Sequence, residues 1–268
     1  MSDDLPLGRP VNAPMHYDPA VLRSIERRTA RLGMGIGEEL PFSGEDVWNC
    51  YELSWLSPSG LPRAGVLTVR VPVESPRIVE SKSLKLYLNG FNAETFEDAD
   101  TVAAAVERDL AAETGGDVRA SIRDSQAVDP PGDFASFCLD DLPAFVERYE
   151  RAPELLTASD ERGADAVHTH LFRTVCPITG QPDWGSVRVD YRGRLLDRTG
   201  LLRYLISYRN AADFHEVVAE RIFVDILGAA DATELTVDAR YLRRGGIDIN
   251  PFRSTNLAEA PPIRLPRQ

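Results

Sequence analysis

The sequence carries the same turn twice: Ser-Gly-Leu-Pro-Arg-Ala-Gly at residues 59–65 and Thr-Gly-Gln-Pro-Asp-Trp-Gly at residues 179–185. Both copies fit the pattern Ser/Thr-Gly-x-Pro-x-x-Gly, and each is followed by residues that alternate between apolar and polar. An alternation with a period of two is typical of a strand with one buried face. The repeated turn therefore predicts a β-hairpin in each half of the chain.

The residues around the two turns extend this duplication. Residues 81–89 fit either a strand or a helix, but their Leu-x-x-Tyr-Leu segment recurs at residues 201–205, where the spacing is helical. We therefore expect a helix at 81–89, ended by Asn89-Gly90. Further strand patterns lie at 67–73, 118–122, 187–191 and 235–241, and further helical patterns at 102–110, 201–206 and 218–227. Each half then holds a hairpin, two helices and a further strand, which predicts an α+β fold with mostly antiparallel sheet.

The pattern divides the chain into four segments. We expect an N-terminal extension at 1–46, a first module at 47–138, a charged linker at 139–165 and a second module at 166–268. A length of 268 residues allows two such modules.

The composition excludes several classes of protein. The chain has 30 Lys and Arg against 42 Asp and Glu, a formal net charge of −12, which argues against a general nucleic-acid binder. No apolar run approaches the roughly 18 residues of a membrane helix, and the first residues lack the pattern of a signal peptide. The three cysteines, Cys50, Cys138 and Cys176, are widely spaced, which favours reduced thiols. We therefore expect a cytoplasmic protein.

The basic residues are strongly biased, because 28 of the 30 are Arg. The only two lysines, Lys82 and Lys85, lie in one short segment. A compact ammonium group differs from the planar guanidinium of Arg, so this bias favours a function for the pair. If residues 81–89 are helical, Glu80, Ser81 and Lys82 lie at the positive end of the helix dipole, which suits an anionic or polar ligand. The alternative is a capped surface helix with a solvated basic edge.

Cys176 and Asp183 are the candidate chemical pair. Aligned by the repeated turn, Cys176 matches Leu56 and Asp183 matches Arg63, so a thiol and a carboxylate seven residues apart occur only in the second half. A hairpin brings these two positions together. The thiol can act as a nucleophile in a suitable environment and the carboxylate as its proton-transfer partner. We interpret Cys50 and Cys138 as small buried apolar residues.

Three histidines are also candidate functional residues. Phe214-His215-Glu216 opens a predicted helix, where it either caps the helix or binds a heterocycle, with His215 moving a proton. His168 and His170 share one strand face, a spacing that metal sites use, but the sequence offers no obvious third ligand. We therefore favour a surface or core role for that pair.

The C-terminal segment is basic. From residue 240 onward there are six Arg against Asp248 and Glu259, so 6 − 2 = +4. The run Arg-Arg-Gly-Gly at 243–246 combines phosphate donors with backbone that a ligand can approach closely. We expect a phosphate-bearing ligand, and since no strand is followed by G-x-G-x-x-G, it is not bound as in a Rossmann fold. The alternative is a basic tail that pairs with the acidic remainder.

These segments together resemble one family. Residues 80–87 (ESKSLKLY), Cys176 with residues 181–186, residues 214–216 and residues 243–246 are similar to motifs of the NADPH-dependent 7-cyano-7-deazaguanine reductases. These are the QueF nitrile reductases of queuosine biosynthesis, a tRNA modification, and the likeness is to their long, two-module form. The resemblance runs from about residue 40 to residue 253.

The resemblance implies a fold, an activity and a set of residues. The fold is a tandem tunnelling fold shared with GTP cyclohydrolase I, with antiparallel sheets and helices packed on one face, assembled as a homodimer. Cys176 forms a covalent thioimide with the nitrile of 7-cyano-7-deazaguanine, Asp183 donates a proton and His215 assists. The implied substrate-binding residues are Val79, Glu80, Ser81, Phe214, His215 and Glu216. The implied cofactor-binding residues are Ser81, Lys82, Arg244 and Gly245, with two NADPH consumed and no metal.

The chemistry of the nitrile agrees with this assignment. A C≡N bond is a poor hydride acceptor, and addition of a thiolate gives a thioimide that is more easily protonated and reduced. Two alternatives stay open. One is a metal-dependent cyclohydrolase acting on a pterin or purine, with His168, His170 and Cys176 as ligands. The other is a non-catalytic purine-binding module, suggested by the half that lacks the thiol.

Overall fold

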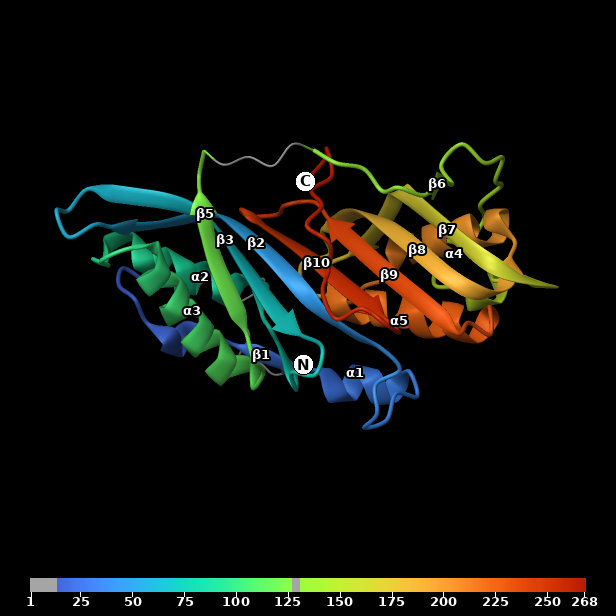
Figure 1. Ribbon diagram of the computed structural model, residues 1–268, viewed down its shortest axis with the longest axis horizontal. Helices are drawn as coiled ribbons and strands as arrows, with labels where there is room; N and C mark the ends of the chain where they lie inside the picture. The colour runs from blue at the N-terminus through green and yellow to red at the C-terminus, as the bar shows by residue number, and fades with distance from the viewer. Residues whose placement is uncertain (1–13, 127–130) are drawn as a thin grey trace. The chain divides into compact units, whose positions relative to one another are not determined.

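The computed structural model describes residues 14–126 and 131–268, which form two compact units (Figure 1). Unit 1 takes in the chain up to Thr29, Asp46–Asp129 and Arg243–Asp248; unit 2 takes in Ala30–Glu45, Pro130–Leu242 and Ile249–Gln268. The first 13 residues of the expected N-terminal extension lie outside the described residues.

Unit 1 contains the first hairpin and the helices that follow it. Strands β2 (Ser43–Leu56), β3 (Pro62–Pro72) and β5 (Arg119–Asp124) lie in the order β5-β3-β2, with β3 and β5 antiparallel. Helix α2 (Ser81–Asn89) precedes α3 (Ala99–Thr114), which packs against β3 and β5. Two short strands, β1 (Ser24–Glu26) and β4 (Arg77–Val79), form a separate antiparallel pair. Short 3-10 turns lie at Pro19–Val21 and Gly90–Ala93.

Unit 2 repeats this order. Strands β7 (Ala158–Val175) and β8 (Pro182–Leu196) form the second hairpin, and β9 (Glu234–Tyr241) and β10 (Ile247–Ser254) extend the sheet beyond β8. Helices α4 (Arg198–Ser207) and α5 (His215–Ala229) pack against β7 and β9. The short β6 (Phe137–Cys138) pairs with β7 in parallel, whereas the other pairs in this unit are antiparallel. The 3-10 turns at Pro153–Leu155 and Tyr208–Asn210 also belong to unit 2, and helix α1 (Arg27–Gly33) begins in unit 1 and ends in unit 2. The expected α+β class with mostly antiparallel sheets is confirmed.

Each core lies on the face of the sheet that the helices cover. In β3, Leu67, Val69 and Val71 are at most 1% exposed, whereas the polar residues between them are half-buried. In β8, Val187 and Val189 are equally buried and face helices whose apolar residues follow the helical spacing, such as Val218 and Ile222. The period of two in the strands and of 3.6 in the helices therefore placed the core residues correctly.

The repeated turn has a physical cause in both halves. Gly60 and Gly180 have φ of +78° and +68°, a left-handed conformation that glycine adopts without a Cβ clash. The two turns differ in length by one residue. Gly60 donates its N–H to Ser57 O, three residues back, whereas Gly180 donates to Cys176 O, four residues back. Cys176 therefore stands where Ser57 stands, and the alignment of Cys176 with Leu56 was wrong by one residue.

Residues 81–89 are helical, as the repeat predicted. The Glu80 side chain caps α2 by accepting N–H groups from Lys82 at 2.7 Å and Ser83 at 2.8 Å. Leu84 and Leu88 point into the core, while Lys85 and Asn89 are exposed. The ambiguous alternation at 84–88 thus belongs to an amphipathic helix.

The structure corrects the expected segment boundaries in three places. Residues 158–165, expected in the linker, form the first half of β7. Residues 30–45 belong to unit 2, where Phe42 packs edge-on against Phe223 at 5.2 Å, and are no mere extension. Residues 243–248, expected in the second module, belong to unit 1. The division into modules at 47–138 and 166–268 stays a prediction.

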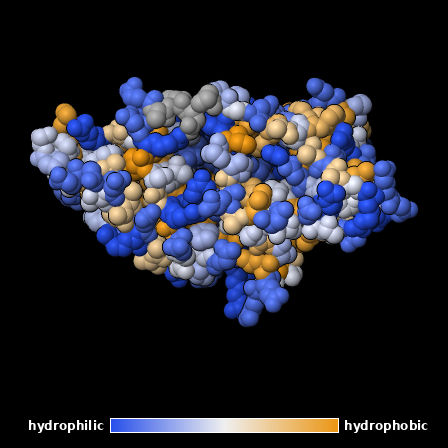
Figure 2. Space-filling model, in the orientation of Figure 1, coloured by the Kyte–Doolittle hydropathy of each residue, from blue (hydrophilic) through white to orange (hydrophobic). Residues whose placement is uncertain are grey.

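The surface is mixed in character. On the face that Figure 2 shows, polar and charged residues lie between small apolar patches. The large apolar side chains that are exposed are scattered along the chain: Met15, Leu32, Leu61, Phe137, Phe145, Tyr149, Leu171 and Leu257. Among the helices of the described residues, none has the length and hydropathy required to cross a membrane.

Candidate active site

Cys176 begins the turn between β7 and β8. Its backbone N–H donates to Gln181 O at 2.9 Å, and Gly180 N–H donates to Cys176 O at 3.0 Å. Its side chain is buried, since the residue is 3% exposed. The thiol is therefore fixed at the base of a hydrogen-bonded turn.

Asp183 lies at the same end of this hairpin. In the register of β7 and β8, Asp183 is opposite Thr174, two residues before Cys176. Side chains that are two residues apart, or directly opposite across a strand pair, project to the same face of a sheet. All three residues are buried. The register thus puts Cys176 and Asp183 on one buried face of the hairpin, and their action as a pair stays a prediction.

His215 completes a group of proton-carrying side chains. It is the first residue of α5, and its Nε2 atom lies 3.2 Å from Oδ2 of Asp183. The side chains are 13% and 6% exposed, so little water screens the pair. A carboxylate and an imidazole in this arrangement can share one proton and pass it on.

Tyr241, at the end of β9, holds the His215 ring from one side. The two rings are stacked with centroids 3.7 Å apart and planes 14° apart. Burial raises the pKa of Tyr241 far above its ordinary value, and the nearby carboxylates of Asp183 and Glu216 add to this effect, so its hydroxyl stays protonated. Nδ1 of His215 is buried and has no hydrogen-bond partner among the described residues. The orientation of the imidazole therefore comes from Tyr241 and Asp183.

Gly185 makes this stacking possible. It pairs with Tyr241 across β8 and β9. A Cβ at position 185 would lie 2.9 Å from Arg240 O and 3.2 Å from Cδ1 of Tyr241. The final glycine of the second turn motif is thus required for the close approach of Tyr241.

The segment before α5 is fastened to the end of β7. Val175 donates its N–H to Ala211 O at 2.9 Å and forms a bridge with Ala212. This contact holds the segment that leads into residues 214–216 beside Val175, the residue that precedes Cys176. Phe214 is the N-cap residue, and Glu216 lies buried in the first turn, where the helix dipole favours a carboxylate.

The remaining predicted site residues lie in unit 1, around the start of α2. Val79 ends β4 and is buried, and Glu80 is 1% exposed. Burial raises the pKa of Glu80, and the N–H groups of Lys82 and Ser83 partly oppose this rise. Ser81 and Lys82 are half-buried at the helix N-terminus. The structure therefore shows Glu80 as a helix cap, and its contact with a substrate stays a prediction.

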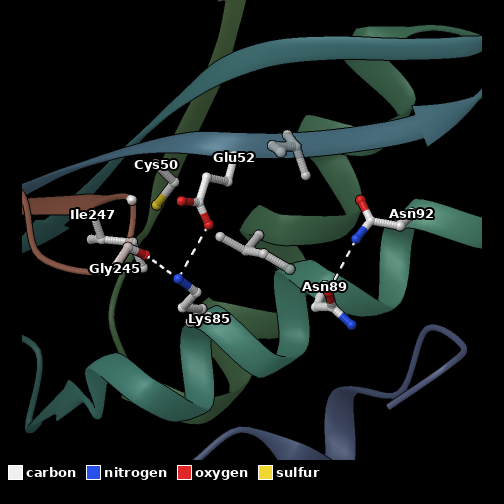
Figure 3. A pocket seen from close by; sticks show the side chains of 10 residues that line it. Cys50, Glu52, Lys85, Asn89, Asn92, Gly245 and Ile247 are labelled. Carbon is white, nitrogen blue, oxygen red and sulfur yellow. Dashed lines mark hydrogen bonds and ion pairs between the residues drawn. The ribbon is translucent and has the colours of Figure 1, made fainter. Parts of the chain in front are cut away.

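Two basic motifs that are 160 residues apart in the sequence meet in unit 1. Lys85 Nζ donates to Gly245 O at 2.6 Å and lies 3.1 Å from the Glu52 carboxylate (Figure 3). Gly245 and Gly246 have φ of +62° and +78°, which closes a tight turn between Arg244 and Ile247. The turn and the start of α2, which hold all four predicted cofactor-binding residues, thus belong to one unit.

A cavity of about 240 Å³ opens beside this contact. Its lining comes from β2, α2, the 3-10 turn after α2 and the glycine turn: Cys50, Glu52, Leu53, Lys85, Leu88, Asn89, Asn92, Gly245, Gly246 and Ile247. Burial raises the pKa of the Cys50 thiol, which keeps it protonated, in agreement with its interpretation as a small apolar residue. Cys138, given the same interpretation, is half-buried in β6.

Comparison with known proteins places the chain in a family. Residues 14–122 match the model described as nitrile reductase, 7-cyano-7-deazaguanine-reductase N-term, and residues 182–260 match the model described as QueF-like protein. The NADPH-dependent 7-cyano-7-deazaguanine reductase of Azoarcus sp. (strain BH72) is 46% identical over 258 residues, 94% of this chain and 90% of that protein. The chain belongs to this family. The reductases of Bordetella avium (strain 197N) and Chromohalobacter salexigens are also 46% identical and cover 96% and 98% of this chain and 96% of each relative.

The likeness to the 7-cyano-7-deazaguanine reductases extends over both units, which agrees with the resemblance seen in the motifs. Among solved structures, the archaeosine synthase QueF-Like in the apo form matches with a TM-score of 0.31 and 20% identity, over 38% of this chain and 99% of that chain.

Sequence reasoning missed two contacts in this member of the 7-cyano-7-deazaguanine reductase family. The stacking of Tyr241 on His215 joins residues 26 positions apart, and the only signal was the position of Tyr241 just before the basic run at 243–246. The second is the carboxylate of Asp133, which lies beside His168 and His170 although it is distant from them in the sequence. Neither histidine is grouped with Cys176, as the cyclohydrolase alternative required.

Proposed function

We propose that this chain reduces the nitrile of 7-cyano-7-deazaguanine to the primary amine of 7-aminomethyl-7-deazaguanine, with NADPH as the reductant and Cys176 as the nucleophile. The observation that carries this proposal is the group formed by Cys176, Asp183 and His215 at one end of the second hairpin. The relatives named as NADPH-dependent reductases of this nitrile support the substrate and the cofactor.

The chain's own residues perform the proton and covalent steps. The sulfur of Cys176 adds to the nitrile carbon, and Asp183 passes a proton to the nitrile nitrogen, which gives the thioimide. When the carbon–sulfur bond later breaks, the sulfur keeps the bonding electrons and takes back a proton. His215 exchanges protons with Asp183 through their 3.2 Å contact and keeps the pair supplied. Bound NADPH supplies the electrons, two molecules for the four-electron change from nitrile to amine.

The binding assignments rest on chemistry at two places. In unit 2, Phe214 and Glu216 flank His215, where an aromatic ring and a carboxylate suit a heterocycle with N–H donors. In unit 1, Val79, Glu80 and Ser81 are assigned to the substrate, and Ser81, Lys82, Arg244 and Gly245 to NADPH. A fit for phosphate groups is supported by the positive dipole end of α2 and by the cationic side chains of Lys82 and Arg244.

Replacement of Cys176 tests the proposal. The Cys176→Ala variant should show neither oxidation of NADPH nor a mass adduct when incubated with 7-cyano-7-deazaguanine. The matched control is Cys138→Ala, a half-buried thiol of the same unit, which should retain both. An adduct that persists in Cys176→Ala would refute the thioimide role. NADPH oxidation that persists without any adduct would leave the reductase activity standing but remove the covalent step.

The assembly and location are further parts of the proposal. We infer that the chain forms a homodimer in the cytoplasm and binds a small deazapurine. We also infer that it binds no nucleic acid, which its net charge of −12 supports. Analytical ultracentrifugation of the full chain should give twice the monomer mass of 29.6 kDa. A measured mass equal to that of the monomer, at the protein concentration used in the activity assay, would contradict the dimer.

A further inference from the structure

Asp133, His168 and His170 form a group that the proposed reaction does not use. One ligand atom from each residue lies within 4.8 Å of the other two. His168 and His170 are two residues apart on β7 and therefore project to the same face. Asp133 comes from the segment ahead of β6, more than 30 residues earlier in the chain.

Both imidazole rings are held in fixed orientations. Ser136 Oγ lies 2.9 Å from Nδ1 of His168, and Ser186 Oγ lies 2.8 Å from Nδ1 of His170. The Phe134 ring is parallel to that of His170, with an angle of 8° between planes. Hydrogen bonds to the ring nitrogen that does not bind the ion are the usual support of histidine ligands in metal sites. His170 has this support, because its Nδ1 contacts Ser186 while its Nε2 faces Asp133.

The distance between His170 and Asp133 suits a small cation. Nε2 of His170 lies 3.5 Å from Oδ1 of Asp133. Two ligand atoms on a tetrahedral Zn²⁺, with bonds of about 2.0 to 2.2 Å, are separated by about 3.3 to 3.6 Å. His168 is 3% exposed, whereas the Asp133 side chain is 68% exposed. The group is thus closed on the β7 side and open on the Asp133 side, where water can supply a fourth ligand.

Charges of both signs surround the group, since Arg267 donates to the backbone oxygen of His170 at 3.2 Å while carboxylates lie on other sides. Asp140 lies next to the group and accepts hydrogen bonds from the Thr169 hydroxyl and from the N–H of His170. Arg188 is opposite His168 in the β7–β8 register, but its guanidinium pairs with the carboxylate of Asp190. Its positive charge is therefore balanced by a neighbour.

We propose that Asp133, His168 and His170 bind one Zn²⁺ ion. Two neutral imidazoles and one carboxylate are the ligand types that zinc prefers, and three protein ligands with one open position are common for it. The ion fastens the segment ahead of β6 to β7. His170 is six residues before Cys176 on an extended strand, about 20 Å at 3.3 Å per residue, so this site is separate from the thiol.

Calorimetric titration of the full-length chain with ZnCl₂ tests this site. The titration uses the Cys176→Ala background, because Cys176, Asp183 and His215 are themselves possible zinc ligands. We expect one Zn²⁺ per chain. Asp133→Asn and His170→Gln should each weaken binding at least tenfold, and Ser186→Ala about 10- to 100-fold through loss of the support for His170. His16→Gln is the matched control, since this exposed histidine also lies beside a carboxylate, that of Glu94. This variant should bind Zn²⁺ as tightly as the background protein.

The outcomes separate a built site from adventitious binding. Absence of zinc binding in the Cys176→Ala protein, or an affinity unchanged by Asp133→Asn, overturns the proposal. Because Asp133 is largely exposed, its replacement leaves the fold intact and the result can be interpreted even if His170→Gln unfolds. Co²⁺ gives a second measurement: the wild-type protein should show visible bands of a tetrahedral ion without the near-ultraviolet band of a thiolate ligand, and that band would assign the metal to Cys176 instead.

Discussion

Tyr241 is a positioning residue for His215, and its effect can be measured. Tyr241→Leu removes the ring that stacks on the imidazole at 3.7 Å, so His215 can rotate away from Asp183. We expect kcat to fall about tenfold, because a stacked pair contributes about 0.5 to 1.5 kcal/mol and misplacement of a proton-carrying group adds to this loss. Steady-state NADPH oxidation measures it. Tyr241→Phe keeps the ring and should retain most of the activity; an equal loss in both variants would show that the hydroxyl matters instead.

Lys82 should distinguish NADPH from NADH. A charge-assisted hydrogen bond to a phosphate contributes about 1.5 to 3 kcal/mol, so Lys82→Ala should raise the KM for NADPH about 10- to 100-fold. The KM for 7-cyano-7-deazaguanine should change much less. If Lys82 contacts the extra phosphate, activity with NADH should be nearly unaffected. A larger effect on the nitrile than on NADPH would reassign this segment to the substrate.

Individual residues were predictable where the repeat made them stand out. Cys176 and Asp183 were singled out because only one of two similar hairpins carries them, and the register puts both on one face, while their roles stay predictions. Tyr241 and Asp133 were not found, since their partners lie on other elements and no local pattern encodes those contacts. Contacts between distant segments depend on strand order and register, which the local pattern of a sequence does not specify.

The N-terminus of α2 depends on Glu80 as its cap. Glu80→Ala removes the acceptor for the N–H groups of Lys82 and Ser83, which should lower the free energy of unfolding by about 1 kcal/mol. Urea unfolding followed by circular dichroism measures this loss. Glu74→Ala, which removes an exposed carboxylate from a turn of the same unit, is the control and should change stability little.

The same residue should leave a pH signature. Burial raises the pKa of Glu80 above its ordinary value of 4.5, so the native state binds its proton more tightly than the unfolded chain does. The contribution of this group to stability is therefore greatest at low pH and falls as the pH rises from about 4.5 through the raised value. Glu80→Gln should remove that decline, so the stability difference between variant and wild type should change across this window. A difference that is constant with pH would contradict the raised pKa.

At the level of helices and strands, the spacing of apolar residues predicted the main helices and both hairpins, but not β10 or the short strands β1, β4 and β6. Residues 81–89 fitted both a strand and a helix, and the related segment at 201–205, whose spacing is helical, indicated the helix. The one-residue difference between the two turns was missed because the motifs were aligned from the glycine onward, whereas Pro58 and Pro177 lie two and three residues before that glycine. The hydrogen bond that closes each turn shows that Cys176 occupies the position of Ser57 and not that of Leu56.

The division into units could not be derived from sequence continuity. The turn at 243–248 follows β9 of unit 2 but belongs to unit 1, where the guanidinium of Arg243 lies 4.5 Å from the Tyr51 ring and Lys85 contacts Gly245. The residues at 30–45 lie before the first module in sequence and belong to unit 2. Both departures come from side chains that contact partners far away in the chain.

Unit 2 is joined by a buried ion network that links three distant parts of the sequence. Glu220 of α5 accepts hydrogen bonds from Arg31 at 2.7 Å and from Arg253 at 3.0 Å. These side chains are at most 9% exposed, so solvent screens them little. Removal of one partner of a buried pair costs about 3 to 5 kcal/mol, because the other charges stay in the interior. We therefore expect Glu220→Gln to lower the free energy of unfolding of this unit by that amount.

Chemical denaturation of the full chain checks the role of this network, with a surface pair as the reference. Glu234 lies 3.4 Å from Arg192, and both side chains are more than half exposed, so Glu234→Gln should cost less than about 1 kcal/mol. Added salt should diminish the small effect of Glu234→Gln and leave that of Glu220→Gln nearly unchanged, because ions screen exposed charges far better than buried ones. If the two variants lost similar stability, or if salt abolished the effect at Glu220, the N-terminal segment at 30–45 would not be held to α5 by this network, and Phe42 packing would have to account for its place in unit 2.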